Sequence, residues 1–269
     1  MKRNILFLIF LMLGTPLLAQ STAGEEIRVP LTKPNEAGSL EISLVTGSIS
    51  VTGTKGKEVV IKASAGESRT REREEAGGLK RIPNTNLGLT VTEQNNKVQL
   101  STEAVTRRVN LEIQVPQNFS LRLSTVNNGE LAVRNVNGNL ELSNVNGSIL
   151  LENVSGNAVA NTTNGYVKAN ILRWDGKSPM AFSTLNGNVD VTLPANSKFN
   201  TKLRSDRGEV YTDFEMTQEA AQTKAGSRNE KGLYRVSTAD FISGKVNGGG
   251  PEILIKNMNG NIYLRKATK

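Results

Sequence analysis

Carboxylates are the main side chains that could carry out chemistry in this 269-residue sequence, because it contains no cysteine and no histidine. Without histidine there is no imidazole that titrates near pH 7, and without cysteine there are no disulfides, thiol nucleophiles or thiolate metal sites. Ser-His-Asp, Cys-His and histidine-ligated zinc chemistry are therefore excluded. Carboxylate, lysine, tyrosine and Ser/Thr chemistry is left.

Paired carboxylates could cleave a polysaccharide, since glycosidases use two acidic side chains about 5 to 10 Å apart. The candidates are Glu130, Glu141, Glu152, Asp190, Asp206, Glu209 and Asp213. The repeat described below places Glu141 beside Val159 and Glu152 beside Arg134, and it yields no pair at that separation. We therefore expect surface charges, no catalytic residues and a protein that is not an enzyme.

The first twenty residues have the pattern of a secretory signal. Lys2 and Arg3 precede an unbroken apolar run over 5–13, and Gly14, Pro16 and Ala19 lead into the cleavage region. The apolar run is too short for a bilayer, which needs about 20 residues. We expect residues 1–20 to be a signal peptide and 21–269 to form a single domain in a bacterial protein that is periplasmic, surface-bound or secreted.

The charge is modestly basic, with 33 Lys+Arg against 25 Asp+Glu. Removing Lys2 and Arg3 leaves 31 against 25, a net charge of +6. The charged run over 67–81 nearly cancels itself and indicates a solvated loop. We expect no nucleic-acid partner; a cell-surface glycan or an envelope protein is the partner that an exported chain of this charge suggests.

Glycine recurs every nine residues in the middle of the chain. The regular copies fall at Gly129, Gly138, Gly147, Gly156 and Gly165, within 126–170, and looser copies fall at Gly47, Gly187, Gly208 and Gly260. Each sits in a variant of Val-Asn-Gly-x-apolar-x-apolar, so it is a turn glycine followed by a strand with one buried face. The apolar residues two before the glycine, at Val136, Val145 and Val154, are expected to turn inward.

Two topologies could use this repeat. Asn-Gly turns could join an antiparallel meander of hairpins, or each unit could form one side of a parallel β-solenoid coil. The recurrence of an apolar corner residue favours the solenoid. Four residues before each glycine, small and charged side chains alternate as Thr125, Arg134, Ser143, Glu152 and Asn161, which indicates a true period of eighteen.

The fold class predicted is therefore all-β, a parallel β-solenoid (β-helix) with about two short strands per 18–22-residue coil. Arg134 should stack on Glu152, and the intervals of 22 from Gly165 to Gly187 and 21 from Gly187 to Gly208 should be one coil each with a small insertion. Looser repeats are expected over 40–125 and 185–266, with an irregular N-terminal cap and a hairpin turn at Asn95-Asn96.

Two long interruptions are expected, a loop over 65–86 and a second over 216–230 that is either a loop or a short helix. The amides of Asn135, Asn144 and Asn153 recur at nine and are expected to form a ladder along the solenoid axis. Trp174 is expected to be a packed or half-exposed aromatic at a coil insertion, with sugar stacking, for it or for Tyr166, as the alternative.

No cofactor or metal site is expected. The array has one glycine per copy and no aspartate over 126–170, so it lacks the calcium-binding nine-residue repeat. The run over 248–251, Gly-Gly-Gly-Pro, has neither the strand-then-helix context nor the lysine of a phosphate loop, and we interpret it as a turn.

Several segments together resemble the bacterial putative-adhesin family, a domain of unknown function. They are the export segment, the strand RVNLEIQVP, the run LRLSTVNNGELAV, the VNG units through Gly165, LNGNVDV and MNGNIYL, and the resemblance covers roughly 40–266. It implies an exported, non-enzymatic solenoid that acts as a binding module at the cell envelope. The alternative is an envelope-stress or signalling accessory with a membrane-protein partner; a carbohydrate-active enzyme is the third and least favoured hypothesis. No site residue is carried over.

Overall fold

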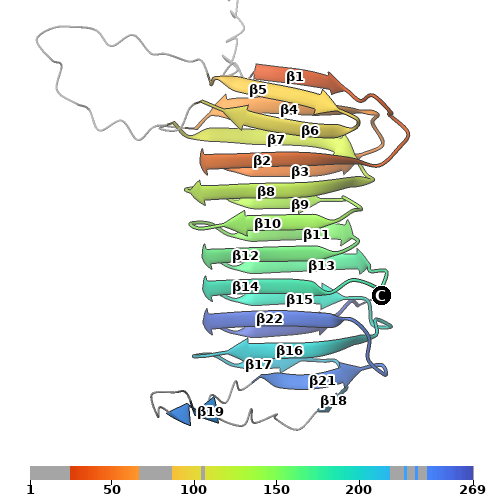
Figure 1. Ribbon diagram of the computed structural model, residues 1–269, viewed down its shortest axis with the longest axis vertical. Helices are drawn as coiled ribbons and strands as arrows, with labels where there is room; N and C mark the ends of the chain where they lie inside the picture. The colour runs from red at the N-terminus through yellow and green to blue at the C-terminus, as the bar shows by residue number, and fades with distance from the viewer. Residues whose placement is uncertain are drawn as a thin grey trace, which may run out of the picture.

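The chain folds into a tall stack of β-strands (Figure 1). The computed structural model describes residues 25–66, 87–103, 107–218, 227–228, 234–235 and 241–268. The predicted signal peptide and nearly all of the predicted loop 65–86 lie outside these residues. Every regular element in the described ranges is a strand, so the all-β prediction is confirmed.

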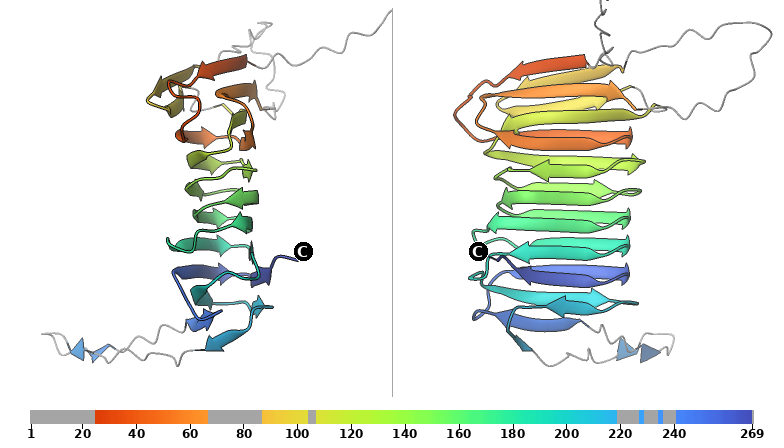
Figure 2. Two further views of the ribbon diagram at one scale, coloured as in Figure 1. Left: turned by 90° about the vertical axis from the view of Figure 1, so that its right-hand side faces the viewer. Right: turned by 180° about the vertical axis from the view of Figure 1, so that it is seen from behind.

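Two large sheets form the molecule, here called sheet A and sheet B, and Figure 2 shows them face to face. Sheet A contains, in spatial order, β1 (Glu25–Pro30), β4 (Glu58–Ala65), β7 (Val109–Pro116), β3 (Ile49–Thr54), β9 (Leu131–Arg134), β11 (Ile149–Ser155), β13 (Val167–Arg173), β15 (Val189–Leu193), β23 (Ile262–Lys266) and β17 (Val210–Thr212). Sheet B contains β18 (Met216–Gln218), β21 (Ile242–Val246), β16 (Phe199–Ser205), β22 (Glu252–Asn259), β14 (Met180–Asn186), β12 (Ala158–Asn164), β10 (Leu140–Asn144), β8 (Phe119–Asn127), β2 (Gly38–Thr46), β6 (Lys97–Thr102) and β5 (Leu89–Gln94).

Each coil contributes one strand to each sheet, and successive coils pair in parallel. The register places Arg134 opposite Glu152 between β9 and β11, and Glu141 opposite Val159 between β10 and β12. Arg134 Nε donates to Glu152 Oε2 at 2.6 Å. The eighteen-residue coil and the solenoid are therefore confirmed, and the meander of hairpins is wrong for the central array.

The C-terminal coil departs from sequence order. Strand β23 lies between β15 and β17, so that Tyr263 is the register partner of both Asp190 and Tyr211. In sheet B, β22 likewise lies between β14 and β16. The interval from Gly187 to Gly208 is one coil, as predicted, but Gly208 stacks on Gly260 and not on Gly187, so the two coils are not neighbours in the stack. The repeat pattern shows which segments form coils, but not the order in which the coils stack. Within the 21-residue interval the chain passes from β15 to β16 and leaves one rung free between them, and β22 and β23 fill that rung.

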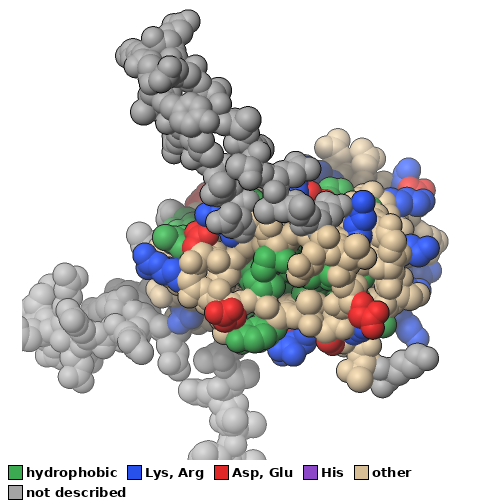
Figure 3. Space-filling model, turned by 90° about the horizontal axis from the view of Figure 1, so that it is seen from below, with side chains coloured by type: hydrophobic (Ala, Val, Ile, Leu, Met, Phe, Trp, Pro, Cys, Tyr) green, Lys and Arg blue, Asp and Glu red, His purple; other side chains and the backbone are tan. Residues whose placement is uncertain are grey.

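The N-terminal coil is inserted in the same way. Strands β2 and β3 pair on one side with β8 and β9 and on the other with β6 and β7, which follow them in the chain. Antiparallel strands β1, β4 and β5 cover this end of the stack, and β21 and β18 extend sheet B at the other. Figure 3 views that second end, with apolar side chains toward the middle of an oval outline and charged ones around the rim.

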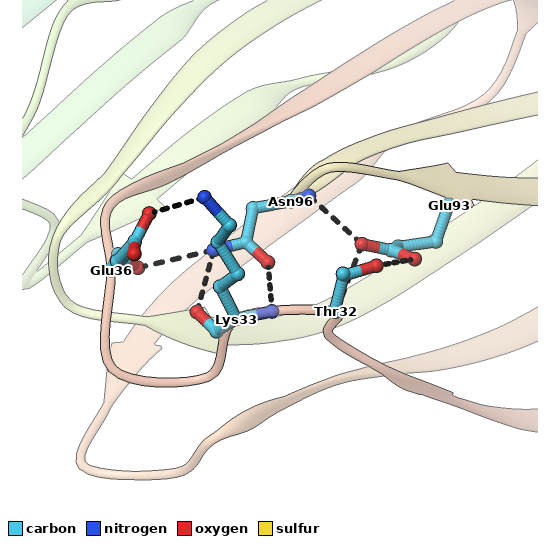
Figure 4. A network of polar contacts seen from close by, with 5 residues as sticks. All are labelled: Thr32, Lys33, Glu36, Glu93 and Asn96. Atoms are coloured by element: carbon cyan, nitrogen blue, oxygen red, sulfur yellow. Dashed lines mark hydrogen bonds and ion pairs between the residues drawn. The ribbon is translucent and has the colours of Figure 1, made fainter.

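The predicted hairpin between β5 and β6 is confirmed, and it helps to fix the N-terminal cap. Asn95 and Asn96 have φ of 52° and 61°, the left-handed conformation that Asn-rich hairpin turns use. Asn96 exchanges hydrogen bonds with the backbone of Lys33, and Glu93 accepts from Asn96 N and from Thr32 N and Oγ1 (Figure 4). These bonds tie the β1–β2 connection to the hairpin.

The core is one cluster of aliphatic columns between the sheets. Strand β10 alternates buried and outward side chains, as the period-two pattern predicted. Val136 and Val154 are 1% exposed, as expected, but Val145 is 38% exposed, so the prediction that it turns inward is wrong. An eighteen-residue coil has two different corners, and the side chain two before the glycine is buried at one of them and solvent-facing at the other.

The predicted loop 216–230 contains strand residues where the structure describes it. Met216–Gln218 pairs antiparallel with β21 as β18. β19 (Ser227–Arg228) pairs antiparallel with β20 (Tyr234–Arg235). The helical alternative is therefore wrong for these described stretches.

Candidate functional site

The predicted turn glycines form columns along the solenoid axis. One column runs through Gly47, Gly129, Gly147, Gly165, Gly187, Gly260 and Gly208, and the opposite corner holds Gly138 and Gly156. A Cβ placed on Gly147 would lie 1.8 Å from the carbonyl oxygen of Gly129, so no other residue fits between the rungs. These glycines are structural and offer no side chain to a ligand.

A column of buried polar side chains reinforces the same corner. Thr162 Oγ1 donates to the carbonyl of Gly147 at 2.7 Å, and Thr184 Oγ1 donates to that of Gly165 at 2.8 Å. The equivalent bonds on other rungs come from Thr125, Asn144, Asn257 and Ser205. Each of these donors satisfies a carbonyl one rung away, which is what a buried backbone acceptor requires.

An asparagine ladder is present, but it uses other residues than predicted. Amide-to-amide bonds of 2.7–3.0 Å link Asn127, Asn146, Asn164, Asn186 and Asn259. Asn135 and Asn153 instead adopt φ of 56° and 54° at the other corner, and Asn144 is buried against Gly129. The nine-residue recurrence combines residues from the two corners. The five-residue ladder follows one corner, and two separate amide pairs, Asn118–Asn137 and Asn139–Asn157, lie at the other.

Five of the seven carboxylates that could have formed a catalytic pair are bonded to arginine or to the backbone. Ion pairs join Glu141 to Arg122 at 2.8 Å, Glu152 to Arg134 at 2.6 Å, Asp206 to Arg204 at 2.6 Å and Asp190 to Arg265 at 2.9 Å. Asp190 raises the pKa of Arg265 by its hydrogen bond and its charge. Asp213 accepts from Lys266 N at 2.7 Å, and Glu130 and Glu209 make no ion pair with another described residue. In the described ranges, no three acidic side chains gather as metal ligands would.

The regular repeat is interrupted at one corner of the solenoid, on the right-hand side of Figure 1. In the regular array, nine residues separate the start of a strand of sheet A from the start of the next strand of sheet B, and the crossing is 135–139 between β9 and β10 and 156–157 between β11 and β12. Three connections at this corner lie outside the nine-residue spacing: 174–179 between β13 and β14, 194–198 between β15 and β16, and 247–251, which joins β21 to β22 within sheet B. In solenoids, such insertions gather on one face, which is often the binding face.

Residues of these three connections line an open cleft of about 680 Å³. Its lining includes Trp174, Asp175, Lys198 and Gly250. Small-molecule sites have volumes of roughly 300–1,000 Å³ and combine apolar walls with a few polar groups. This cleft, here called the corner cleft, falls within that size range and has both apolar and polar lining residues.

Trp174 forms a fixed wall of the corner cleft. Its indole Nε1 donates to Asn157 Oδ1 at 3.1 Å and to the carbonyl of Ser178 at 3.2 Å. The ring packs against the core, 6.2 Å from the ring of Phe199 between centroids. The prediction of a half-exposed aromatic at a coil insertion is confirmed, and the N–H is already satisfied within the protein.

The other two walls are tied to each other. Asn247 Nδ2 donates to the carbonyls of Ala195 and Ser197 at 3.1 and 2.8 Å, which links the connections 247–251 and 194–198. Gly249 has φ of 85°, and the turn predicted for 248–251 is confirmed. The inserted C-terminal coil brings these two connections together, because β22 follows 247–251 directly.

The charge of the corner cleft is net positive. Arg173 and Lys198 are both exposed, and neither makes an ion pair with another described residue. Asp175 Oδ1 accepts from Lys177 N at 2.9 Å within its own connection. Two cations, one anion and an aromatic wall can orient an anionic or sugar-like ligand, and they hold no carboxylate pair for hydrolysis.

Sequence reasoning identified Trp174 but missed Arg173, Asn196 and Lys198 as its companions. The 22-residue interval between Gly165 and Gly187 marked the first insertion. Nothing in the spacing shows that a connection near residue 250 joins it. That contact follows from the position of the C-terminal coil.

Comparison with known proteins gives a family and two solved structures. The sequence model of the family described as Toastrack DUF4097 matches residues 7–248. A "putative cell adhesion protein" of Clostridium sporogenes has a TM-score of 0.47 at 12% identity, covering 91% of this chain and 100% of its own. A "putative adhesin" of Bacteroides fragilis has a TM-score of 0.31 at 12% identity, covering 92% and 98%. No curated protein matches the chain. Within the described ranges, no helix has the length and apolarity to cross a bilayer.

Proposed function

The chain belongs to the Toastrack DUF4097 family, and from that premise we propose that it is an exported, non-enzymatic binding module of the cell envelope. The observation that carries the proposal is the corner cleft of about 680 Å³, built where three insertions interrupt an otherwise regular solenoid. The paired parallel rungs of the central array support these connections on a rigid frame. Rigid frames with variable loops are the usual design of binding proteins.

The side chains support binding over catalysis. Four of the seven candidate carboxylates pair with arginine, and a fifth accepts from the backbone. Carboxylates bonded to arginine in this way do not form the free pair, about 5 to 10 Å apart, that glycosidases use. The corner cleft adds one carboxylate, Asp175, and no second one among its lining residues.

Export is supported by the first twenty residues. A basic start, a short apolar run and small residues before position 20 fit a signal peptide of a bacterial protein. An exported chain without cysteine cannot be stabilised by disulfides, and here the stacked strands and the ladders of amide and hydroxyl hydrogen bonds take that role. Periplasm, cell surface and medium are all compatible with this proposal.

A second candidate function, an accessory protein that contacts a membrane-associated protein, is favoured by one observation. Five apolar side chains lie on the corner that carries the asparagine ladder, in a row that Thr163 interrupts, and each is 37–42% exposed: Val45, Val126, Val145, Leu185 and Met258. At the opposite corner the equivalent positions are buried. Aligned exposed aliphatic residues are typical of surfaces that contact proteins.

The test uses the chain purified after export, immobilised and exposed to a glycan array and to envelope extract. The proposal predicts saturable binding that Lys198→Glu reduces, while Lys168→Glu leaves it unchanged; Lys168 is also exposed but lies on the outward face of β13. Binding abolished by Val145→Ser with Leu185→Ser, but not by Lys198→Glu, would favour the accessory protein instead. Turnover of any polysaccharide by the purified chain would overturn the non-enzymatic proposal.

A further inference from the structure

We propose that the corner cleft recognises an anionic saccharide, with a pyranose ring on the face of Trp174 and its acidic substituent held by Arg173 and Lys198. This inference rests on the proposed binding function and names the ligand class. Arg173 is the last residue of β13, Trp174 begins the connection 174–179, and Lys198 ends the connection 194–198.

The aromatic wall points to a sugar ring. Because both bonds of the Trp174 indole N–H go to the protein and the ring is half-buried against the core, what remains for a ligand is the part of the ring that lines the cleft. The C–H face of a pyranose is apolar and weakly positive, and it stacks on the electron-rich face of an aromatic ring. Leu172 and Pro194 also line the cleft and extend its apolar surface.

The two cations point to an acidic group on that sugar. Arg173 ends β13 and Lys198 ends the connection 194–198, so they approach the cleft from different coils. Elsewhere on the outward faces, arginine side chains such as Arg122 and Arg134 have carboxylate partners, but these two cations have none among the described residues. An anionic ligand would supply the missing partner through charge-assisted hydrogen bonds.

The remaining lining is polar and suits hydroxyl groups. Asn196 is exposed and Ser197 half-buried, and both lie between Pro194 and Lys198 on the same wall. An amide and a hydroxyl can each donate and accept, as sugar hydroxyls do. The volume of about 680 Å³ accommodates a short oligosaccharide rather than a folded partner.

Titration calorimetry with three hexasaccharides tests the inference: hexagalacturonate, a sulfated hexasaccharide and neutral galactohexaose. We expect both acidic probes to bind at least tenfold more tightly than the neutral one, with an affinity that falls as salt rises. Equal binding of the two acidic probes supports recognition of negative charge, and a preference for hexagalacturonate supports recognition of the carboxylate.

The variants locate the site. Lys198→Ala and Arg173→Ala should each weaken hexagalacturonate binding about tenfold, the effect of losing one charge-assisted bond, and Lys168→Ala should not. Trp174→Phe keeps an aromatic wall and should retain more affinity than Trp174→Leu, and thermal unfolding checks that both variants fold.

Two outcomes would overturn the inference and are distinguishable. Equal affinity for neutral and acidic probes, lost in Trp174→Leu but not in Lys198→Ala, would refute the anionic ligand and leave the binding module intact. No binding of any probe, with envelope binding unchanged in both variants, would refute the anionic ligand and the cleft together.

Discussion

Substitution of Gly187 tests the stacked-glycine corner most sharply. Gly187 has φ of +146°, and a Cβ there would lie 2.2 Å from the carbonyl oxygen of Gly165. Relieving that contact to about 3.2 Å means separating the two rungs locally by about 1 Å, which weakens the 2.9 Å bond from Gly165 N to Asn186 O. Overpacking of this kind costs about 1–3 kcal/mol, and the disfavoured φ adds about 1–2 kcal/mol. We expect Gly187→Ala to lower the free energy of unfolding by about 4 kcal/mol.

The matched control is Gly176→Ala. Gly176 also has a positive φ, +64°, but nothing lies within 4 Å of a Cβ at that position. Its substitution should therefore cost only the backbone term, about 1 kcal/mol. Urea unfolding followed by circular dichroism measures both values. Equal destabilisation by the two substitutions would refute the reasoning, because it would mean that backbone conformation alone, and not contact between rungs, requires glycine at position 187.

Two further predictions concern the corners and the cap. Val154→Ser should destabilise the fold by about 2–3 kcal/mol, whereas Val145→Ser should change stability by less than about 0.5 kcal/mol, because these side chains are 1% and 38% exposed; similar urea midpoints for the two variants would contradict the assignment of the corners. Bonds from the backbone of Thr32 and Asn96 lower the pKa of Glu93 below its ordinary value of 4.5. A lowered folded pKa stabilises the fold above pH 4.5, and this contribution is lost as the pH falls through the folded pKa. Glu93→Gln should therefore lose less thermal stability between pH 7 and pH 3 than the unsubstituted chain, and an identical loss would argue against the cap network.

The coil itself was predictable because one rung repeats its chemistry in the next. Alternation of small and charged residues four before each glycine gave the eighteen-residue period, and the pairing of Arg134 with Glu152 follows from it. Short-range regularity of this kind is a property of the sequence alone. It determines which residues face in and which rung-to-rung contacts are compatible.

The order of the coils could not be predicted in the same way. The segment MNGNIYL has the same apolar pattern as LNGNVDV, so it fits beside any rung of the array. Its actual place depends on long-range packing at both ends of the stack, where β17 and the strands β21 and β18 complete the sheets. The corner cleft depends on that order, because residues near 250 meet residues near 196 only when the last coil is inserted. Arg173 and Lys198 therefore remained ordinary surface charges in the sequence.

The insertion of the C-terminal coil between two earlier coils determines both the strand order of the sheets and the position of the corner cleft. The natural chain has no cysteine, so a disulfide between two introduced cysteines shows that those two positions are close, with no competing thiol in the chain. Asp190 and Tyr263 are register partners, so their Cα atoms lie about 4.8 Å apart, within the range of a disulfide; Asp190 and Tyr211 lie two rungs apart, at about 9.6 Å. Under mild oxidation, Asp190→Cys with Tyr263→Cys should form an intramolecular disulfide and Asp190→Cys with Tyr211→Cys should not. A disulfide in the second pair and none in the first would contradict the inserted coil.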